Sequence, residues 1–332
     1  MKAMKSLNED IETGQFKNVY LLFGEEAYLK KQYKDRLTKA MLPEGDTMNY
    51  AYYEGKGINV PEVIDLAETM PFFADRRLIV IENSGFFKSA VPELADYIKV
   101  APETTHFLFV EEEIDKRSKM YKAVQARGRV VEMERQNEKT LLLWIRKMVN
   151  QEGKRIQEST VRYFLSKVGA DMENLEKEME KLFCYTMDEA EITCADIDEI
   201  CTTQITNKIF DMVEAVALKR QKAALDYYYD LLALKEPPMR ILYLLSRQFK
   251  QLLEVRELLK KNYSQKQIAQ AVGLHPYVAG KYISQCKAFS SQELRQILEE
   301  AAELEESVKT GKLNDRMSVE LFILRESAAP SK

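Results

Sequence analysis

The amino-acid sequence predicts an α/β domain with a parallel sheet, followed by an all-α region. Two observations support this prediction. Short β-rich apolar runs alternate with amphipathic helical patterns up to residue 135, and the strand signals stop after Glu138. Strands that alternate with helices of about ten to fifteen residues are typical of a parallel sheet covered on both faces. The chain has 332 residues, and a length of this order corresponds to about two domains.

Five strands and four helices are expected in the α/β part. The apolar runs predict strands at 19–23, 48–53, 78–81, 105–110 and 129–133. Helical periodicity between them predicts helices at 25–39, 60–70, 91–100 and 118–126. Together these elements indicate a three-layer domain over residues 1–137.

The rest of the chain has short predicted helices followed by longer ones. Amphipathic patterns predict a small helical domain over 138–206, with helices at 140–151, 159–167, 171–183 and 196–201. A third domain over 207–332 is expected to hold helices at 209–218, 221–234, 238–260, 265–272, 277–286, 290–310 and 315–326. Asp171 stands at a helix N-cap position, and Ser290 with Glu293 forms a capping-box pattern.

The composition excludes several classes of protein. Lys and Arg number 49 against 53 Asp and Glu, so the net charge of −4 gives no global attraction to nucleic acid, while a local basic patch stays open. No apolar run approaches the roughly 20 residues that a membrane span needs. The first fifteen residues lack the apolar core of a secretory signal. We therefore expect a cytoplasmic protein that does not bind membranes.

Metal binding and acid–base catalysis are not indicated either. The four cysteines form no C-x-x-C pair and only two histidines accompany them, so a zinc site is not expected. The cysteines are interpreted as small core residues with reduced thiols. His106 lies in an apolar strand and is interpreted as a core or edge histidine. No nucleophile motif is present, and we expect no catalytic residue and no metal.

The turn after the first strand is the place where a doubly wound sheet binds phosphate. Here Gly24 is followed by Glu25 and Glu26, and no G-x-x-x-x-G-K-[ST] sequence occurs in the chain. The two carboxylates would repel a triphosphate, although they suit the helix dipole. Nucleotide hydrolysis is therefore not expected, and no cofactor is assigned.

Residues 264–278 have the spacing of a helix-turn-helix. Ile268 would pack on the first helix, and Gly273 would end that helix in a left-handed turn. Lys281 and Lys287 could then reach a DNA phosphate. The same geometry also serves a helical hairpin inside a bundle, and the acidic helix that follows favours the hairpin. A helix-turn-helix DNA-binding regulator with an α/β sensor domain stays open as an alternative function.

The segment 68–77 is unusual because Pro71 ends a helix and two aromatic residues follow it before a buried strand. Adjacent side chains on a strand point to opposite faces, so at most one of Phe72 and Phe73 would suit a single core face. The pair would serve either as an apolar anchor for a pocket on a partner protein or as a cover for the edge of the sheet. The residues alone do not decide between these two interpretations.

Several longer motifs follow one another in a specific order. They are Val19-Tyr-Leu-Leu-Phe-Gly-Glu-Glu-Ala-Tyr-Leu29, Met70-Pro-Phe-Phe-Ala-Asp-Arg-Arg-Leu-Ile-Val80, Asp115-Lys-Arg-Ser-Lys-Met-Tyr121, Val168-Gly-Ala-Asp-Met-Glu-Asn-Leu-Glu-Lys-Glu-Met-Glu-Lys-Leu182, and Ala288-Phe-Ser-Ser-Gln-Glu-Leu294. Each is weak alone, but their order and spacing are specific. In these motifs the chain resembles the delta subunit of the bacterial DNA polymerase III clamp loader.

The resemblance implies an AAA+-like α/β domain without a phosphate loop, a small helical lid domain and a C-terminal helical collar domain. It also implies binding to the ring-shaped sliding clamp (beta), which the delta subunit helps to open for loading onto primed DNA. In the family a hydrophobic pair makes this contact. The pair falls on Phe72 and Phe73, with Met70 and Pro71 before them, and some relatives have Leu at the position of Phe72.

The resemblance further implies the other clamp-loader subunits, in a heteropentamer, and primer–template DNA as partners within the assembly. It implies no catalysis by this chain itself, although the assembly is a DNA polymerase. The long collar helix is expected to present an apolar stripe to neighbouring subunits, formed by Leu242, Leu245, Phe249, Leu252 and Leu253.

Overall fold

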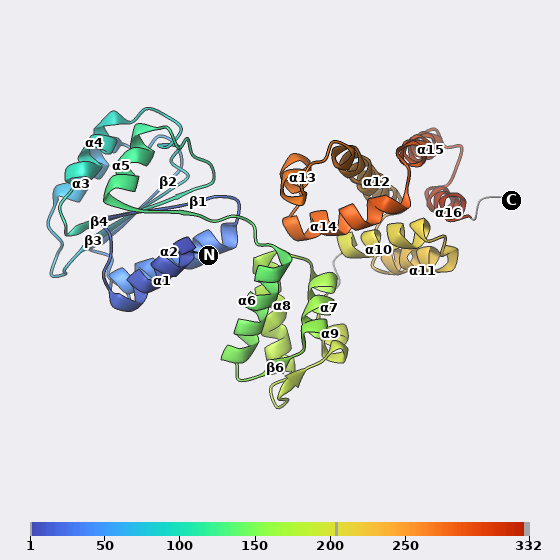
Figure 1. The fold of residues 1–332 in the computed structure, drawn as a ribbon, viewed down its shortest axis with the longest axis horizontal. Helices are drawn as coiled ribbons and strands as arrows, with labels where there is room; N and C mark the ends of the chain where they lie inside the picture. The colour runs from blue at the N-terminus through green and yellow to red at the C-terminus, as the bar shows by residue number, and fades with distance from the viewer. Residues whose placement is uncertain (1, 203–204, 329–332) are drawn as a thin grey trace. The chain divides into compact units, whose positions relative to one another are not determined.

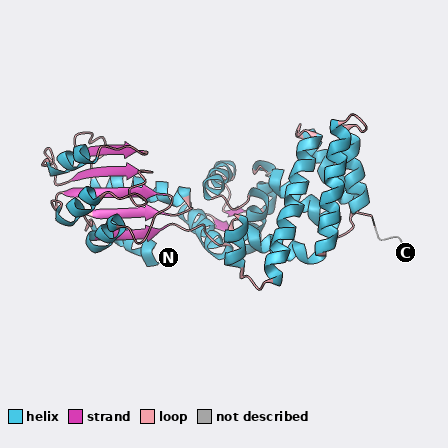
Figure 2. Cartoon of the chain, turned by 90° about the horizontal axis from the view of Figure 1, so that it is seen from above, coloured by secondary structure: helices cyan, strands magenta, loops and turns pink. Residues whose placement is uncertain are grey.

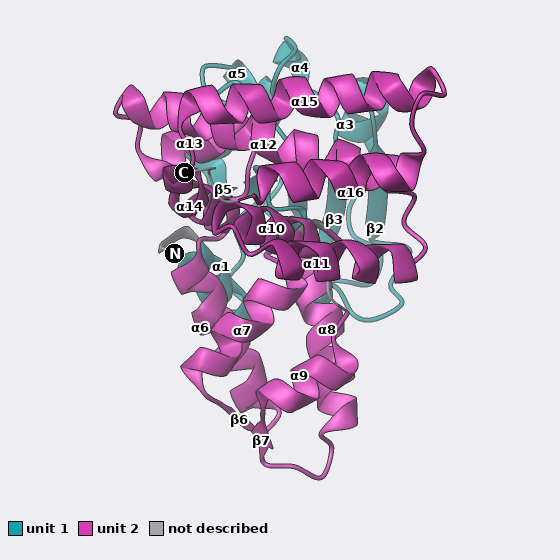
Figure 3. Ribbon diagram, turned by 90° about the vertical axis from the view of Figure 1, so that its right-hand side faces the viewer, with its two compact units in different colours: residues 1–135 teal, residues 136–332 magenta. Residues whose placement is uncertain are grey.

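The computed structural model describes residues 2–202 and 205–328 and forms two compact units, Met1–Arg135 and Gln136–Lys332 (Figure 3). The first unit corresponds to the predicted α/β domain. The second contains both the short and the long helices. The further boundary within it, at 206/207, stays a prediction.

The first unit is built on a five-stranded parallel sheet in the order β2-β3-β4-β1-β5. The strands are β1 (Val19–Phe23), β2 (Tyr50–Glu54), β3 (Arg77–Glu82), β4 (Thr105–Glu111) and β5 (Gly128–Glu132). β1 and β4 lie in the middle of the sheet and are buried along their whole length. The predicted fold class, an α/β sheet domain followed by helices, is therefore confirmed.

Helices cover both faces of this sheet (Figures 1 and 2). One face carries α3 (Val60–Glu68), α4 (Pro92–Val100) and α5 (Lys119–Arg127), whose apolar side chains share a core with alternate residues of the central strands. The other face carries α1 (Lys2–Thr13) and α2 (Ala27–Met41). Burial on both faces explains why the central strands are continuous apolar runs.

Helix α1 is not among the elements that the sequence predicts. It adds Leu7 to the core and is attached to the sheet through buried Asp10. The Tyr20 hydroxyl donates to Asp10 Oδ2 at 2.9 Å, and Arg129 Nη2 donates to Asp10 Oδ1 at 2.6 Å. Leu7 and Ile11 stand at helical spacing, so the amphipathic pattern of α1 is present in the sequence although no helix was predicted there.

The second unit begins with short helices: α6 (Glu138–Gln151), α7 (Glu158–Val168), α8 (Met172–Tyr185) and α9 (Cys194–Ile200). The expectation that strands end at Glu138 is wrong, because β6 (Arg155–Ile156) pairs in parallel with β7 (Glu191–Ile192). Strands of two residues are too short for an alternation of apolar and polar side chains to show.

Seven further helices lie in the described part of the second unit. They are α10 (Ile205–Ala217), α11 (Gln221–Ala233), α12 (Pro238–Lys260), α13 (Gln265–Val272), α14 (Pro276–Gln285), α15 (Ser291–Lys309) and α16 (Asp315–Glu326), with a 3₁₀ turn at Cys286–Ala288. The predicted caps at Asp171 and Ser290 are confirmed, since each side chain accepts from a backbone amide three residues on. Gly273 ends α13 in the left-handed conformation, as the sequence predicts.

The apolar stripe of α12 is the core of this bundle and not a surface for neighbours. Leu242, Leu245, Phe249 and Leu252 are buried, and Leu253 is partly buried against them. The expectation that they face other subunits is therefore wrong. The larger apolar side chains that remain exposed in these helices and in the turns between them are Leu218, Tyr229, Leu234, Tyr243, Tyr263, Met317 and Leu324.

The cysteine prediction is half right. Cys201 and Cys286 are buried, whereas Cys184 and Cys194 are exposed, and all four are free thiols. In the described ranges, 2–202 and 205–328, no helix is long and apolar enough to cross a membrane.

Candidate functional site

The loop 69–76, between α3 and β3, presents its apolar side chains to solvent. Met70 is 82% exposed, Phe72 is 54% exposed and Phe73 is 96% exposed. The helix before the loop ends at Glu68, two residues earlier than predicted. The interpretation that both rings cover the sheet edge is therefore wrong for Phe73, and Phe72 is about half exposed. Large apolar side chains held together in water are the chemistry of a protein-binding surface.

Two buried side chains, those of Asn49 and Arg77, make hydrogen bonds to the backbone of this loop. Phe72 N donates to Asn49 Oδ1 at 2.6 Å, and Asn49 Nδ2 donates to the Phe72 carbonyl at 2.9 Å. Arg77, at the start of β3, donates from Nη2 to the Met70 carbonyl at 3.2 Å. The backbone that bears the exposed rings is thus hydrogen-bonded to residues at the start of β2 and β3.

The two rings form one unit. Their centroids are 4.6 Å apart and their planes lie at 82°, which is an edge-to-face pair. Phe73 has a φ of +49°, in the left-handed region that a bulky residue rarely adopts. Such a conformation persists only where the surroundings enforce it, and it is concentrated at functional sites.

Asn49 is the part of this site that the sequence does not reveal. It falls within the predicted strand 48–53, whereas β2 begins at Tyr50. An Asp three residues before it, Asp46, is a turn signal that marks where the strand starts. No local pattern indicates that the carboxamide reaches a loop 23 residues away.

The turn at Gly24, where the sequence predicts no phosphate binding, follows the carboxyl end of β1, whereas the loop 69–76 precedes the amino end of β3. Gly24 has a φ of +121°, and a Cβ there would lie 2.5 Å from the Met133 carbonyl oxygen. Gly24 N donates to the Glu112 carbonyl at 3.2 Å, and Glu26 N donates to the Met133 carbonyl at 2.9 Å. These amides bond neighbouring strand ends and so are not directed at a ligand.

Carboxylates gather at this edge of the sheet. Glu25 and Glu26 follow β1, and Glu111 and Glu112 lie at the end of neighbouring β4. Lys30, the nearest cation on α2, donates to the Glu111 carbonyl at 3.1 Å. Burial lowers the pKa of the Lys30 amine and raises that of the Glu111 carboxyl. The place where a doubly wound sheet binds nucleotide is therefore lined with acidic side chains.

These observations predict that the chain does not bind ATP tightly. Titration of the purified chain with Mg·ATP in a calorimeter is expected to give a dissociation constant weaker than about 1 mM, because the turn offers no free row of amides and no phosphate-binding lysine. Micromolar affinity that is altered by substitutions at Glu25 or Glu26 would contradict this.

The segment 264–278, which has the spacing of a helix-turn-helix, contains α13 and the start of α14. Of the residues of α14, all of which the structure describes, Ser284 alone is exposed. Lys281 is partly buried, with Nζ 5.0 Å from the Tyr277 ring centroid and 5.6 Å from that of Phe210. A recognition helix needs a free face for the major groove, so the geometry favours a hairpin inside the bundle.

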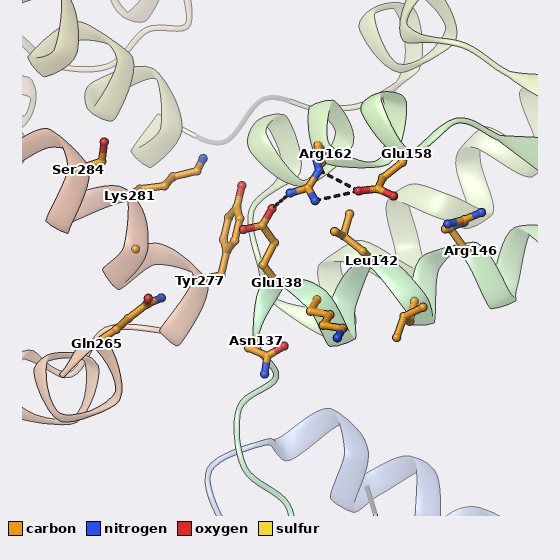
Figure 4. A pocket seen from close by; sticks show the side chains of 13 residues that line it. Asn137, Glu138, Leu142, Arg146, Glu158, Arg162, Gln265, Tyr277, Lys281 and Ser284 are labelled. Carbon is orange, nitrogen blue, oxygen red and sulfur yellow. Dashed lines mark hydrogen bonds and ion pairs between the residues drawn. The ribbon is translucent and has the colours of Figure 1, made fainter.

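A cleft of about 870 Å³ separates this hairpin from α6 and α7 within the second unit. Figure 4 shows Tyr277 and Lys281 directed toward the cleft from α14, and Arg162 bridging Glu138 and Glu158 on the other wall. The ion pair from Arg162 Nη2 to Glu158 Oε1 measures 2.8 Å. Burial raises the pKa of Tyr277 to about 12. Because Arg162 is paired with Glu138 and Glu158, its positive charge is already neutralised within this chain.

We accordingly predict weak DNA binding by the isolated chain. A fluorescence titration with a short duplex at physiological salt is expected to show non-specific binding no tighter than about 1 µM. Sequence-specific binding that Lys281→Ala abolishes would instead support the regulator interpretation.

The described residues contain no group of three or more His, Cys, Asp or Glu side chains that could hold a metal ion. His106 is buried, and its Nδ1 lies 2.9 Å from the Lys17 carbonyl. His275 caps α14, where its Nδ1 accepts from Tyr277 N at 3.2 Å. Both histidines thus have structural partners.

Two family models match this chain. Residues 20–134 match the model described as DNA polymerase III, delta subunit, and residues 206–326 match the model of the DNA polymerase III delta subunit, C-terminal domain. The first match contains the loop 69–76 and the turn at Gly24. The second contains nearly all of the long-helix bundle.

Whole-chain relatives agree with these matches. The chain is 28% identical over 329 residues to the DNA polymerase III subunit delta of Bacillus subtilis (strain 168), covering 96% of this chain and 95% of the relative. It is 23% identical over 294 residues to a protein described as probable DNA polymerase III subunit delta of Aquifex aeolicus (strain VF5), covering 84% and 83%. Among solved structures, the Bacillus subtilis DNA clamp loader delta protein is similar with a TM-score of 0.79 and 26% identity, covering 97% of this chain and 99% of that one.

Proposed function

The chain belongs to the DNA polymerase III delta subunit family, and from this we propose that it works in DNA replication as the clamp-loader subunit that binds the sliding clamp. In this role it helps to open the ring for loading onto primed DNA. It acts within the DNA polymerase III assembly in the cytoplasm and needs no cofactor of its own.

The clamp contact is made by Met70, Pro71, Phe72 and Phe73. The observation that supports this is the exposure of an edge-to-face pair of phenylalanine rings on a backbone that is hydrogen-bonded to the sheet. Aromatic side chains that enter an apolar pocket supply much of the binding free energy at protein interfaces. Exposure in the free chain leaves this energy available for the partner.

Ring opening follows from differential binding. A ligand shifts a conformational equilibrium only by the difference between its affinities for the two states. If the loop 69–76 binds the open ring more tightly than the closed one, it holds the ring open without consuming nucleotide. The acidic turn at Gly24–Glu26 fits this division of labour, in which other subunits hydrolyse nucleotide and control access to the loop.

The long helices serve as the collar that joins the chain to the other loader subunits in a heteropentamer, which together hold primer–template DNA. The residues proposed for this contact differ from the stripe expected on α12. They are the exposed apolar side chains of the bundle, such as Tyr229 and Leu234 on and after α11, Tyr243 on α12 and Met317 on α16.

The experiment that tests the proposal mixes the purified chain with the purified sliding clamp of the same organism. A stable complex is expected in size-exclusion chromatography, and a fluorophore pair across the clamp's subunit interface should report separation when the chain binds. Absence of any complex at micromolar concentrations, with both proteins folded, would contradict the proposal.

A further inference from the structure

One buried side chain, that of Asn49, makes both hydrogen bonds to the backbone of Phe72. Asn49 is 2% exposed and comes from the start of β2, while Phe72 lies in the loop before β3. The Asn49 carboxamide accepts a hydrogen bond from the Phe72 amide at 2.6 Å and donates one to the Phe72 carbonyl at 2.9 Å. Both backbone polar groups of one residue are thus bonded to one side chain.

The orientation of Asn49 is itself fixed. Nδ2 donates to Asp46 Oδ2 at 2.8 Å, and the Asn49 amide donates to Asp46 Oδ1 at 3.0 Å. These hydrogen bonds lower the pKa of Asp46. The Asn49 carbonyl accepts from the amide of Leu78, in β3, at 2.9 Å. Because Nδ2 must face the acidic side chain, Oδ1 is left to face the Phe72 amide.

We propose that Asn49 is a positioning residue for clamp binding, one that sets the loop in its binding conformation before the clamp arrives. This inference rests on the proposed contact through Phe72 and Phe73. Asn49 touches no clamp atom in this scheme. It fixes Phe72, and the fixed Phe72 places Phe73 in its left-handed conformation with the two rings perpendicular.

The physical basis is the entropy of binding. A loop that samples many conformations must lose them when its side chains enter a pocket, and that loss weakens the complex. A loop held at Phe72 by Asn49 and at the Met70 carbonyl by Arg77 has lost this freedom during folding. Removal of the carboxamide should therefore reduce clamp affinity while both rings remain present.

The test compares wild type, Asn49→Ala, Asn49→Asp, Phe72→Ala/Phe73→Ala and the triple variant Asn49→Ala/Phe72→Ala/Phe73→Ala, all as purified full-length chains. Asn18→Ala is the matched control, since the Asn18 carboxamide also bonds a backbone carbonyl in the same unit, that of Glu103 at 3.1 Å, but at another loop. Clamp affinity is measured by surface plasmon resonance, melting temperature by calorimetry, and protection of the loop amides by hydrogen exchange.

Asn49→Ala is expected to weaken clamp binding about tenfold, as the freeing of one or two backbone residues would do. The loop should exchange its amide hydrogens faster, with unchanged protection in β1 and β4. Asn49→Asp loses the donor and places a second carboxylate against Asp46 Oδ2 and the Phe72 carbonyl, so its affinity should fall at least as far as that of Asn49→Ala. Asn18→Ala should bind as wild type.

The double-mutant comparison separates two kinds of failure. If Asn49 acts through the rings, its substitution has no further effect on affinity once both rings are alanine. Wild-type affinity in Asn49→Ala, together with lost binding in the ring variant, would overturn the role of Asn49 and leave the clamp contact intact. Unchanged affinity in the ring variant would overturn the proposed contact itself. An equal loss in Asn18→Ala and Asn49→Ala would show a general effect on stability and overturn positioning.

Discussion

Replacing both Phe72 and Phe73 with alanine is expected to lower the affinity for the sliding clamp at least about 30-fold, with little change in the melting temperature of the chain. Central aromatic anchors typically cost about 2–4 kcal/mol each on truncation, which corresponds to about 30- to 1,000-fold for each ring. Folding should be almost unaffected, because the Phe73 side chain is almost fully exposed to solvent and that of Phe72 is about half exposed. The measurements are clamp affinity by surface plasmon resonance and the melting temperature by calorimetry.

A matched control is Tyr185→Ala, which removes an aromatic ring that is similarly exposed at the end of α8. It should leave clamp affinity unchanged. The prediction fails if the double variant melts many degrees lower and binds the clamp normally whenever it is folded. That result would assign the rings to the stability of the α/β unit.

Replacing Phe249 with alanine is expected to destabilise the helical bundle by about 3–5 kcal/mol, the range for deletion of a buried aromatic ring. Phe249 is fully buried on α12, and its ring meets those of Phe289 and Phe322 edge-on, with centroids at 5.7 and 6.2 Å. Deletion leaves a cavity at the junction of α12, α15 and α16. Urea unfolding followed by circular dichroism measures the loss.

The control lies on the same helix. Tyr243 is 62% exposed, and Tyr243→Ala should change the free energy of unfolding by less than about 0.5 kcal/mol. A small effect for Phe249→Ala combined with loss of binding to the other loader subunits would contradict the core assignment. It would restore the interpretation in which the α12 stripe faces a neighbouring chain.

The sequence was sufficient where burial is regular along the chain. β1 and β4 are buried on both faces and appear as unbroken apolar runs, and α12 was predicted with its observed bounds, Pro238–Lys260, because its apolar residues recur at helical spacing and a proline precedes it. Local hydrogen-bonding patterns were equally informative, as the capping box at Ser290 shows. In these cases the physical cause lies within a few residues of its effect.

The sequence was insufficient where the cause lies far along the chain. The aromatic pair was visible as a pair, but its exposure depends on how a distant Asn49 fixes the loop. The stripe on α12 was visible as apolar, but a stripe looks the same whether its partner is another helix of the chain or another protein. The position of α1 on the sheet involves the pairing of Asp10 with Arg129, and no local window contains both residues.

Gly24 changes how a glycine at the first strand–helix turn should be understood in this fold. The packing of the backbone requires glycine at this position, since the Cβ of any other residue would clash with the Met133 carbonyl. Its presence would survive the complete loss of a ligand, while Glu25 beside it is exposed and makes only an ion pair with Arg135 at 3.4 Å. In a collection of related sequences, an invariant glycine at this turn would therefore record the packing of one backbone against another and would carry no information about phosphate.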